Sequence, residues 1–145
     1  MSENHSYPES LKQVVDEFNQ APKTLRLALL LDYAKKLPPL PDELRGTLER
    51  VHECQTPLFL KADVAPDGTA RLRFEAPEEA PTTRGFASVI SRGLNGVSVE
   101  DVLAVPDDFY QDLGLAELIS PLRLRGMGAI VTRVKRQLKE VGAGA

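Results

Sequence analysis

The side chain with the clearest capacity for chemistry is the thiol of Cys54, the only cysteine among 145 residues. It lies in the segment HECQTPLF, residues 52–59. A lone thiol has no second cysteine with which to close a disulfide. The two histidines, His5 and His52, are too few and too scattered to supply a dense set of metal ligands. We therefore expect no metal and no cofactor, and a thiol that reacts only with a partner molecule.

Cys54 has two interpretations at this level. Free cysteines in helical proteins are most often small buried hydrophobes. Cys54 instead follows polar residues and precedes Pro57, on a connection and not on an apolar helix stripe. Loop residues are commonly accessible and functional, although position alone does not give the pKa that a reactive thiol needs. A structural and a functional thiol both stay open, and the connection favours an accessible one.

His52 offers a base for Cys54. In an extended segment, residues two apart project from the same face, so the imidazole could take the thiol proton. Such a pair is typical of Cys-His hydrolases. A hydrolase also needs an oxyanion hole and a third group that orients the base, and the sequence has no recognisable signature of either. A stand-alone hydrolase is therefore the weaker hypothesis, and a zinc site from Cys54, His52 and carboxylates is weaker still.

A basic helix start with two glycines is the other unusual feature. Ser120-Pro121 is a helix cap followed by a proline in the first turn, and Arg123 and Arg125 come next. Most such arginines are simply solvated. Gly126 and Gly128, however, each cost about 1 kcal/mol relative to alanine inside a helix. Their presence predicts that another segment of the chain approaches the helix backbone there.

Length and composition favour one domain. A chain of 145 residues with 42% apolar content can bury roughly 70% of its unfolded surface, which is enough for one core. We expect a single domain over residues 1–145, with its core at about 11–138 and flexible ends. The net charge of -3 argues against nucleic-acid binding, which needs a surplus of cations. The longest apolar run, residues 27–31, is far shorter than the ~20 residues of a membrane span. A cytoplasmic protein with a reduced thiol is therefore expected.

The residues before Cys54 carry a helical period. Ser10 and Gln13 form a capping-box signal ahead of an amphipathic helix. Residues 25–37 are apolar nearly all round and end before two prolines, which is typical of a buried central helix. Pro41 is predicted to begin a weaker helix that reaches Val51.

After Cys54 the apolar period changes to two. Residues 58–64 and 70–76 alternate around a Pro-Asp-Gly turn, which predicts a hairpin with one buried face. Because two strands alone are marginal, the hairpin must pack on helices, and the residues around Cys54 are candidates for a third, edge strand. Thr83, Ser98 and Ser120 are predicted to cap three further helices. The expected fold is α+β, with a small antiparallel β-sheet packed against several helices.

Four short motifs stand in order along the chain. They are Cys54-Gln55-Thr56, Arg84-Gly85, Leu113-Gly114-Leu115 and the segment SPLRLRGMGA at residues 120–129. With this order and spacing, the chain from about residue 11 to residue 138 resembles the SufE family of sulfur-acceptor proteins of iron-sulfur cluster assembly. Three features depart from the family pattern. Glu53 stands where glycine is common, Arg125 stands where asparagine or glutamine is usual, and Leu58-Phe59 stand where the hairpin often carries a tryptophan.

The resemblance implies a SufE/IscU-like fold and a sulfur relay. By this resemblance Cys54 takes sulfane sulfur from a SufS-type cysteine desulfurase as a persulfide, and the protein stimulates that enzyme and passes the sulfur to a SufBCD-type scaffold. Arg123 matches the family's arginine near the partner surface, and Gln55, His52 and Gly126 are expected to support the site. Such a protein has no turnover alone. A non-carrier interaction module, or an allosteric activator of the desulfurase, is the alternative.

Sulfur transfer also fits the residues by themselves. A thiolate attack on a sulfur-sulfur bond needs one acceptor thiol and no resolving cysteine. Glu53 disfavours a thiolate on its neighbour, so cations of a partner, or Arg123, must offset its charge. We therefore expect a sheltered thiol that is activated when a partner docks.

Overall fold

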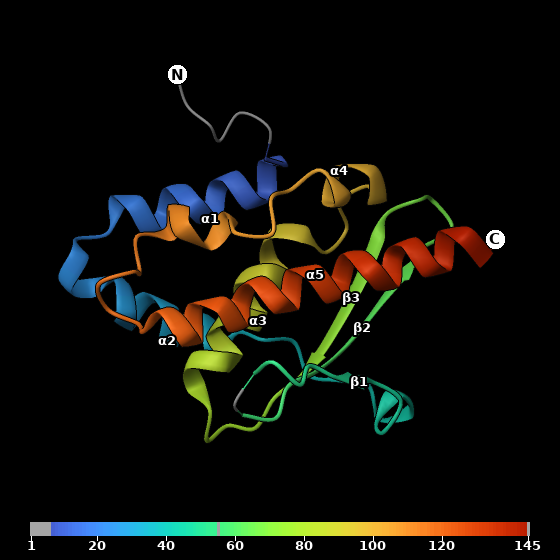
Figure 1. Ribbon diagram of the computed structural model, residues 1–145, viewed down its shortest axis with the longest axis horizontal. Coiled ribbons are helices and arrows are strands. Elements are labelled where there is room, and N and C mark those ends of the chain that lie inside the picture. The colour runs from blue at the N-terminus through green and yellow to red at the C-terminus, as the bar shows by residue number, and fades with distance from the viewer. Residues whose placement is uncertain (1–6, 55, 145) are drawn as a thin grey trace.

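The computed structural model describes residues 7–54 and 56–144 (Figure 1). These residues form five α-helices, three 3-10 turns and one three-stranded sheet, which confirms the α+β class. None of the helices in these ranges is long and apolar enough to cross a membrane. The elements are α1 (Glu9–Gln20), η2 (Lys23–Leu25), α2 (Arg26–Lys35), η3 (Asp42–Leu44), β1 (Glu49–Arg50), β2 (Phe59–Val64), β3 (Ala70–Glu75), α3 (Pro81–Leu94), α4 (Val99–Leu103), η4 (Phe109–Leu113) and α5 (Pro121–Gly144).

The sheet is antiparallel, with the strand order β1-β2-β3. β2 and β3 form the predicted hairpin, which is confirmed, with residues 59–64 opposite residues 70–75. β1 pairs with the start of β2 and is the expected edge strand, just ahead of Cys54 in the chain. α5 lies against β2 (Figure 1), where the side-chain oxygen of Gln137 accepts a hydrogen bond from the backbone N–H of Ala62 at 2.6 Å. The sheet and α5 therefore form one framework around the segment that carries the thiol.

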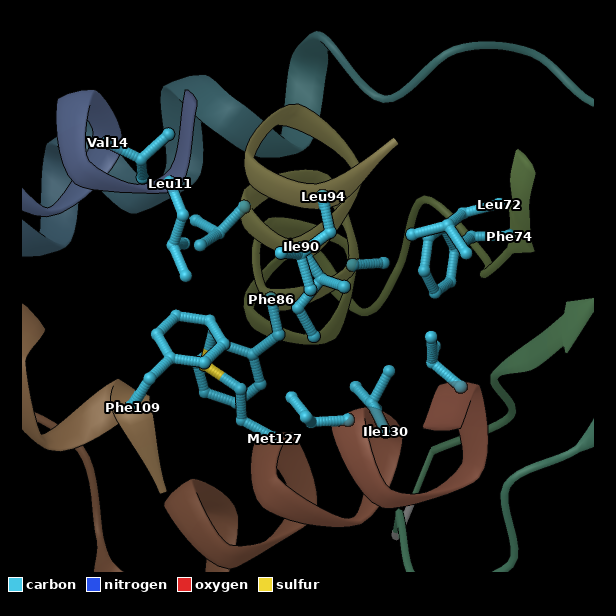
Figure 2. Packing of buried hydrophobic residues seen from close by; sticks show 14 of the residues in the cluster. Leu11, Val14, Leu72, Phe74, Phe86, Ile90, Leu94, Phe109, Met127 and Ile130 are labelled. Carbon is cyan, nitrogen blue, oxygen red and sulfur yellow. The ribbon is translucent and has the colours of Figure 1, made fainter. Parts of the chain in front are cut away.

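The central helix of the core is α3. Figure 2 shows its buried side chains between those of α1, β3 and α5. Two glycines allow α1 and α2 to pack closely on it. A Cβ on Gly85 would lie 2.7 Å from the backbone oxygen of Leu30 in α2, and a Cβ on Gly93 would lie 2.7 Å from a methyl group of Leu11 in α1. Both distances are shorter than real contacts, so the approach of these helices requires glycine.

The helix predicted at residues 25–37 is confirmed as α2, but the prediction that it is the buried central helix is wrong. α2 ends at Lys35 and buries only its residues Leu30, Tyr33 and Ala34. Leu25, just before it, is 54% exposed. α2 packs against α3 with one face, so the leucines on its other side stay at the surface. An apolar composition all round a helix therefore does not place it at the centre when the fold covers only one of its faces.

The weaker helix predicted from Pro41 to Val51 is also wrong. Its beginning is the single turn η3, and the chain then reverses at Gly46, whose φ of +78° favours glycine. After this turn, residues 49–50 extend along β2. Pairing with the sheet therefore overrides the helical spacing of the leucines in this segment.

Two of the predicted helix caps are confirmed and two are wrong. The hydroxyl oxygens of Ser98 and Ser120 accept hydrogen bonds from the backbone N–H three residues later, at 3.2 and 3.3 Å. Ser10 and Thr83 lie inside helices that begin before them. Ser10 instead donates its hydroxyl to the carbonyl oxygen of Gly93 at 2.6 Å, so it ties α1 to α3.

Candidate functional site

Cys54 lies in the turn that follows β1 and is buried, with 8% of its surface exposed. Its backbone N–H donates to the carbonyl oxygen of Val51 at 3.2 Å, which closes the turn. Its Sγ lies 3.8 Å from the carbonyl oxygen of Gly126, in the second turn of α5, and donates to it. The turn folds the side chain inward against α5, so the accessible thiol favoured by its place on a connection is wrong, and the sheltered resting thiol is confirmed.

The two glycines of α5 mark places where other segments approach its backbone, as the sequence predicts. A Cβ on Gly126 would lie 3.6 Å from the Sγ of Cys54. A Cβ on Gly128 would lie 3.1 Å from the ring of Tyr110, the second residue of η4. The thiol is therefore one of the two groups that lie directly over this part of the helix.

A small pocket opens beside the thiol. Its volume is about 30 Å³, more than the roughly 10–15 Å³ that one water molecule needs. The hydroxyl oxygens of Thr56 and Thr83 lie 2.7 Å apart and are hydrogen-bonded in its wall. Its lining residues are Glu53, Cys54, Thr56, Thr83, Phe86, Leu122, Arg123 and Gly126. The pocket therefore has room for a small added group, such as one sulfur atom, beside Sγ.

The environment keeps the thiol protonated. Burial raises the pKa of Cys54 to about 11, and the neighbouring Glu53 carboxylate adds to the rise, whereas the charge of Arg133 opposes it. A hydrogen bond from its own backbone N–H, and then Arg133, hold the pKa of Glu53 below its ordinary value. At neutral pH the site therefore contains a neutral thiol beside a carboxylate. The neutral thiol is the less reactive form.

The cation nearest this chemistry, Arg133 of α5, is one that the sequence analysis missed. Its Nη2 donates to Oε1 of Glu53 at 3.0 Å, and its Nη1 donates to the backbone oxygen of Arg50 at 3.3 Å and to the carboxylate of Glu49. The only signal in the sequence is that residues 133, 136 and 137 share one helix face. Nothing in that spacing says that the face meets β1.

The predicted site residues are only partly brought together. Arg123 lines the pocket and is exposed, and its guanidinium makes no ion pair or hydrogen bond with any residue that the structure describes. Gly126 lies under the thiol. Gln55 lies outside the described residues. Thr83, predicted as a helix cap, is instead a wall of the pocket, and its buried position next to Thr56 gave no separate signal in the sequence.

His52 does not support Cys54 in the way the sequence suggested. Residues 51–54 form a turn and not an extended segment, and His52 is exposed. Between described residues, the hydrogen bond of the Cys54 thiol goes to Gly126 and not to the imidazole. The geometry therefore lacks the base contact that a Cys-His hydrolase requires. Within residues 7–54 and 56–144, no group of three or more His, Cys, Asp and Glu side chains is placed to hold a metal ion.

The fold and this site define a small α+β protein built around one sheltered thiol. The chain belongs to the SufE family, described as "SufE: Fe-S metabolism associated domain", which matches residues 12–138. The resemblance inferred from the four motifs is therefore confirmed.

Relatives of the chain are known from bacteria. An uncharacterized SufE-like protein of Mycobacterium tuberculosis is 52% identical over 136 residues, 93% of this chain and 95% of that protein. The sulfur acceptor protein CsdE of Escherichia coli is 26% identical over 134 residues, 92% of this chain and 88% of that protein. The solution structure of a hypothetical protein from Thermus thermophilus has a TM-score of 0.85 at 47% identity, covering 94% of this chain and 98% of that one.

Proposed function

We propose that this protein is a sulfur acceptor and carrier. Cys54 takes sulfane sulfur from the persulfide of a SufS-type cysteine desulfurase, and the protein passes it on to a SufBCD-type scaffold of iron-sulfur cluster assembly. The observation that carries the proposal is the position of the only thiol, sheltered at a pocket of about 30 Å³ in a chain of the SufE family. The relative CsdE, named as a sulfur acceptor protein, supports the same role.

The transfer step needs only the thiol of Cys54 and the donor persulfide. The thiolate of Cys54 attacks the outer sulfur of the donor, a new sulfur-sulfur bond forms on Cys54, and the sulfur-sulfur bond of the donor breaks. The donor cysteine leaves as a thiolate and takes up the proton that Cys54 has lost. The sulfane sulfur moves without any net oxidation or reduction, so neither a second cysteine nor a cofactor is required.

The resting geometry favours protection over reactivity. With a pKa of about 11 the buried thiol is almost entirely neutral at physiological pH, and its Sγ lies against Gly126. A donor persulfide on another protein is too large to enter the pocket, so the Cys54 segment must move outward when the desulfurase docks. Water replaces the apolar surroundings of the thiol in that state, and its pKa falls toward the ordinary value. The pocket then shelters the returning persulfide from solvent.

Arg123 is the residue that we assign to the partner-facing side of this site. Its charge has no partner among the described residues and lies at the pocket wall. In the docked state it is available to stabilise the anionic sulfur species as Cys54 leaves its sheltered position. The exposed side chain of Leu122, 50% accessible, lies next to it and offers apolar area for the same contact.

The experiment is an intact mass measurement after incubation with a cysteine desulfurase and free cysteine. A gain of one sulfur atom on the wild-type chain, absent in Cys54→Ser, is the expected result. Alkylation of Cys54 should be slow in the free protein and faster with a catalytically dead desulfurase. If Cys54 stays unmodified while the chain still stimulates the desulfurase, the carrier role is wrong and the alternative, an allosteric activator, replaces it. Hydrolysis of an ester or amide by the chain alone would point to the hydrolase instead.

A further inference from the structure

Arg133 connects the two ends of the short segment that carries the thiol. At the β1 end it donates to the carboxylate of Glu49 and to the backbone oxygen of Arg50, and at the other end it donates to Glu53, directly before Cys54. The side chain of Arg133 is only 18% exposed, so it is held in place along α5. One guanidinium thus spans the turn from a strand to the reactive residue.

The two ends differ in how firmly they are held. Glu49 also accepts hydrogen bonds from Arg136 and Gln137, and Gln137 in turn bonds the backbone of Ala62 in β2. Glu53 has Arg133 as its only side-chain partner in the described part of the chain, and it is 54% exposed. Loss of the Arg133 contact therefore leaves the β1 end attached and weakens the hold on the Cys54 end, where the turn bond to Val51 and the contact with Gly126 still act.

We propose that Arg133 is a positioning residue for sulfur transfer, whose ion pair with Glu53 holds the Cys54 segment closed and must break before the thiol reaches a donor. Only the opening toward a sulfur donor rests on the proposed function, since the closed state is present in the free protein. A single exposed pair changes an equilibrium by a factor of about two to five. That is enough to bias the segment toward the closed state and weak enough for a docking partner to reverse.

We call the Arg133–Glu53 ion pair, in its role of holding the segment closed, the latch. The two charges of the pair shift the pKa of the thiol in opposite directions, so the latch can be distinguished from a purely electrostatic effect. Glu53 raises the pKa of Cys54, so its neutralisation speeds thiol alkylation under either explanation. Arg133 lowers that pKa, so its neutralisation slows alkylation if charge alone matters. If Arg133 holds the segment closed, the same substitution makes the thiol more accessible and speeds alkylation. Arg133→Gln is therefore the decisive variant.

The test is the rate of alkylation of Cys54 by iodoacetamide in the free, full-length chain at one mildly alkaline pH. We expect Glu53→Gln and Arg133→Gln each to react about two- to fivefold faster than wild type. The double variant should react no faster than the faster single variant, because the two residues act as one pair. Added salt should speed the wild type and leave the variants unchanged. Glu140→Gln, which removes an exposed pair with Arg136 further along α5, is the matched control and should react at the wild-type rate.

Slower or unchanged alkylation in Arg133→Gln, or additive effects in the double variant, would overturn the latch. If thermal melting shows that Arg133→Gln does not fold, Arg133→Lys replaces it. Lysine keeps the charge that lowers the thiol pKa but cannot reach both carboxylates with one planar group, so faster alkylation is again expected and an unchanged rate overturns the proposal. The readout involves no desulfurase. A latch without mass gain on Cys54 therefore refutes the carrier role alone, and mass gain without a latch refutes only this inference.

Discussion

The two halves of α5 use the same residue types in opposite ways. In residues 121–128 the arginines at 123 and 125 are exposed and make no ion pair with a described residue, and the helix backbone lies open to Cys54 at Gly126. In residues 129–144 three cations are each paired with carboxylates from other parts of the fold, namely Arg133, Lys135 and Arg136. An unpaired arginine, Arg123, therefore lies at the pocket, and the paired cations lie where the helix meets β1 and residue 107.

This difference in ion pairing indicates which charges of α5 are available to a partner. Exposed ion pairs contribute only about 0.2–1 kcal/mol each to the free energy of unfolding, so the pairs of the second half do more for position than for stability. The arginines of the first half contribute nothing visible to the fold. The position of Arg123 at the pocket beside the thiol fits a surface that is completed by another molecule.

The largest expected effect is that of Cys54→Ser, which removes the reactive sulfur that packs against the first half of α5. Sulfur acceptance should fall to zero. The free energy of unfolding should change by no more than about 1 kcal/mol, because serine is close in volume and its hydroxyl can donate to the carbonyl oxygen of Gly126 as the thiol does. Intact mass after incubation with desulfurase measures sulfur acceptance, and thermal melting measures the change in stability. A loss much larger than about 1 kcal/mol would contradict this prediction and show that the packing of the buried thiol itself stabilises the core.

The next effect compares an arginine of the first half with a lysine of the second. Arg123→Ala should slow sulfur acceptance roughly tenfold, equivalent to about 1.4 kcal/mol of lost stabilisation in the docked complex. Lys139→Ala makes the same change in net charge at an exposed position far along α5 and should have little effect. Initial rates of cysteine turnover by the desulfurase, with each variant added, give the comparison. Equal effects would reduce the contribution of Arg123 to general electrostatic steering.

Local signals in the sequence predicted the elements well where a single segment decides its own structure. The alternation of residues 58–64 and 70–76 and the caps at Ser98 and Ser120 are such cases. The segment around Pro41 was misjudged because its leucine spacing is helical, whereas its conformation depends on pairing with β2. Residues 25–37 were misjudged because burial depends on what covers a helix, and no window of sequence contains that information.

In the candidate site too, residues in short motifs could be predicted from the sequence, whereas contacts between distant segments could not. Cys54, Arg123 and Gly126 could be selected from short motifs, and the structure places them around one pocket. The contact of Arg133 with Glu53 joins residues 80 positions apart, and no periodicity in either segment records it. The role of His52 as a base rests on the rule that side chains two residues apart lie on the same face of an extended segment. Residues 51–54 form a turn, so the rule does not apply to them.

The pH dependence of the thiol is a third test of how closely it is held against α5. Because the folded-state pKa is about 11, above the ordinary value of 9.0, the alkylation rate should rise about tenfold for each pH unit below 11. The neutral thiol stabilises the fold, so its contribution is complete below pH 9 and is lost as the pH rises through about 11. Cys54→Ser should lack this loss, which amounts to about 2–3 kcal/mol at most. Denaturant unfolding of both proteins across this range supplies the difference.

A midpoint for alkylation near the ordinary thiol value would contradict the sheltered state. It would mean that Cys54 already spends much of its time away from Gly126 in the free protein. A faster reaction of Arg133→Gln at neutral pH, with a midpoint no lower than that of wild type, would in contrast fit a segment that opens more often, because loss of the arginine charge by itself raises the thiol pKa.

The smallest expected effect comes from the glycines of the first half. Gly126→Ala should stabilise the fold by about 0.5–1 kcal/mol, because alanine favours the helix and its Cβ would lie 3.6 Å from Sγ, an ordinary contact. Gly128→Ala should gain less or lose a little, because its Cβ would lie 3.1 Å from the Tyr110 ring, which must shift. The stabilised Gly126→Ala should nevertheless accept sulfur more slowly, since the added methyl group lies against Sγ beside a pocket of only about 30 Å³. Thermal melting and intact mass on both variants separate the two effects, and unimpaired sulfur acceptance by Gly126→Ala would show that the sulfur is not held in this pocket.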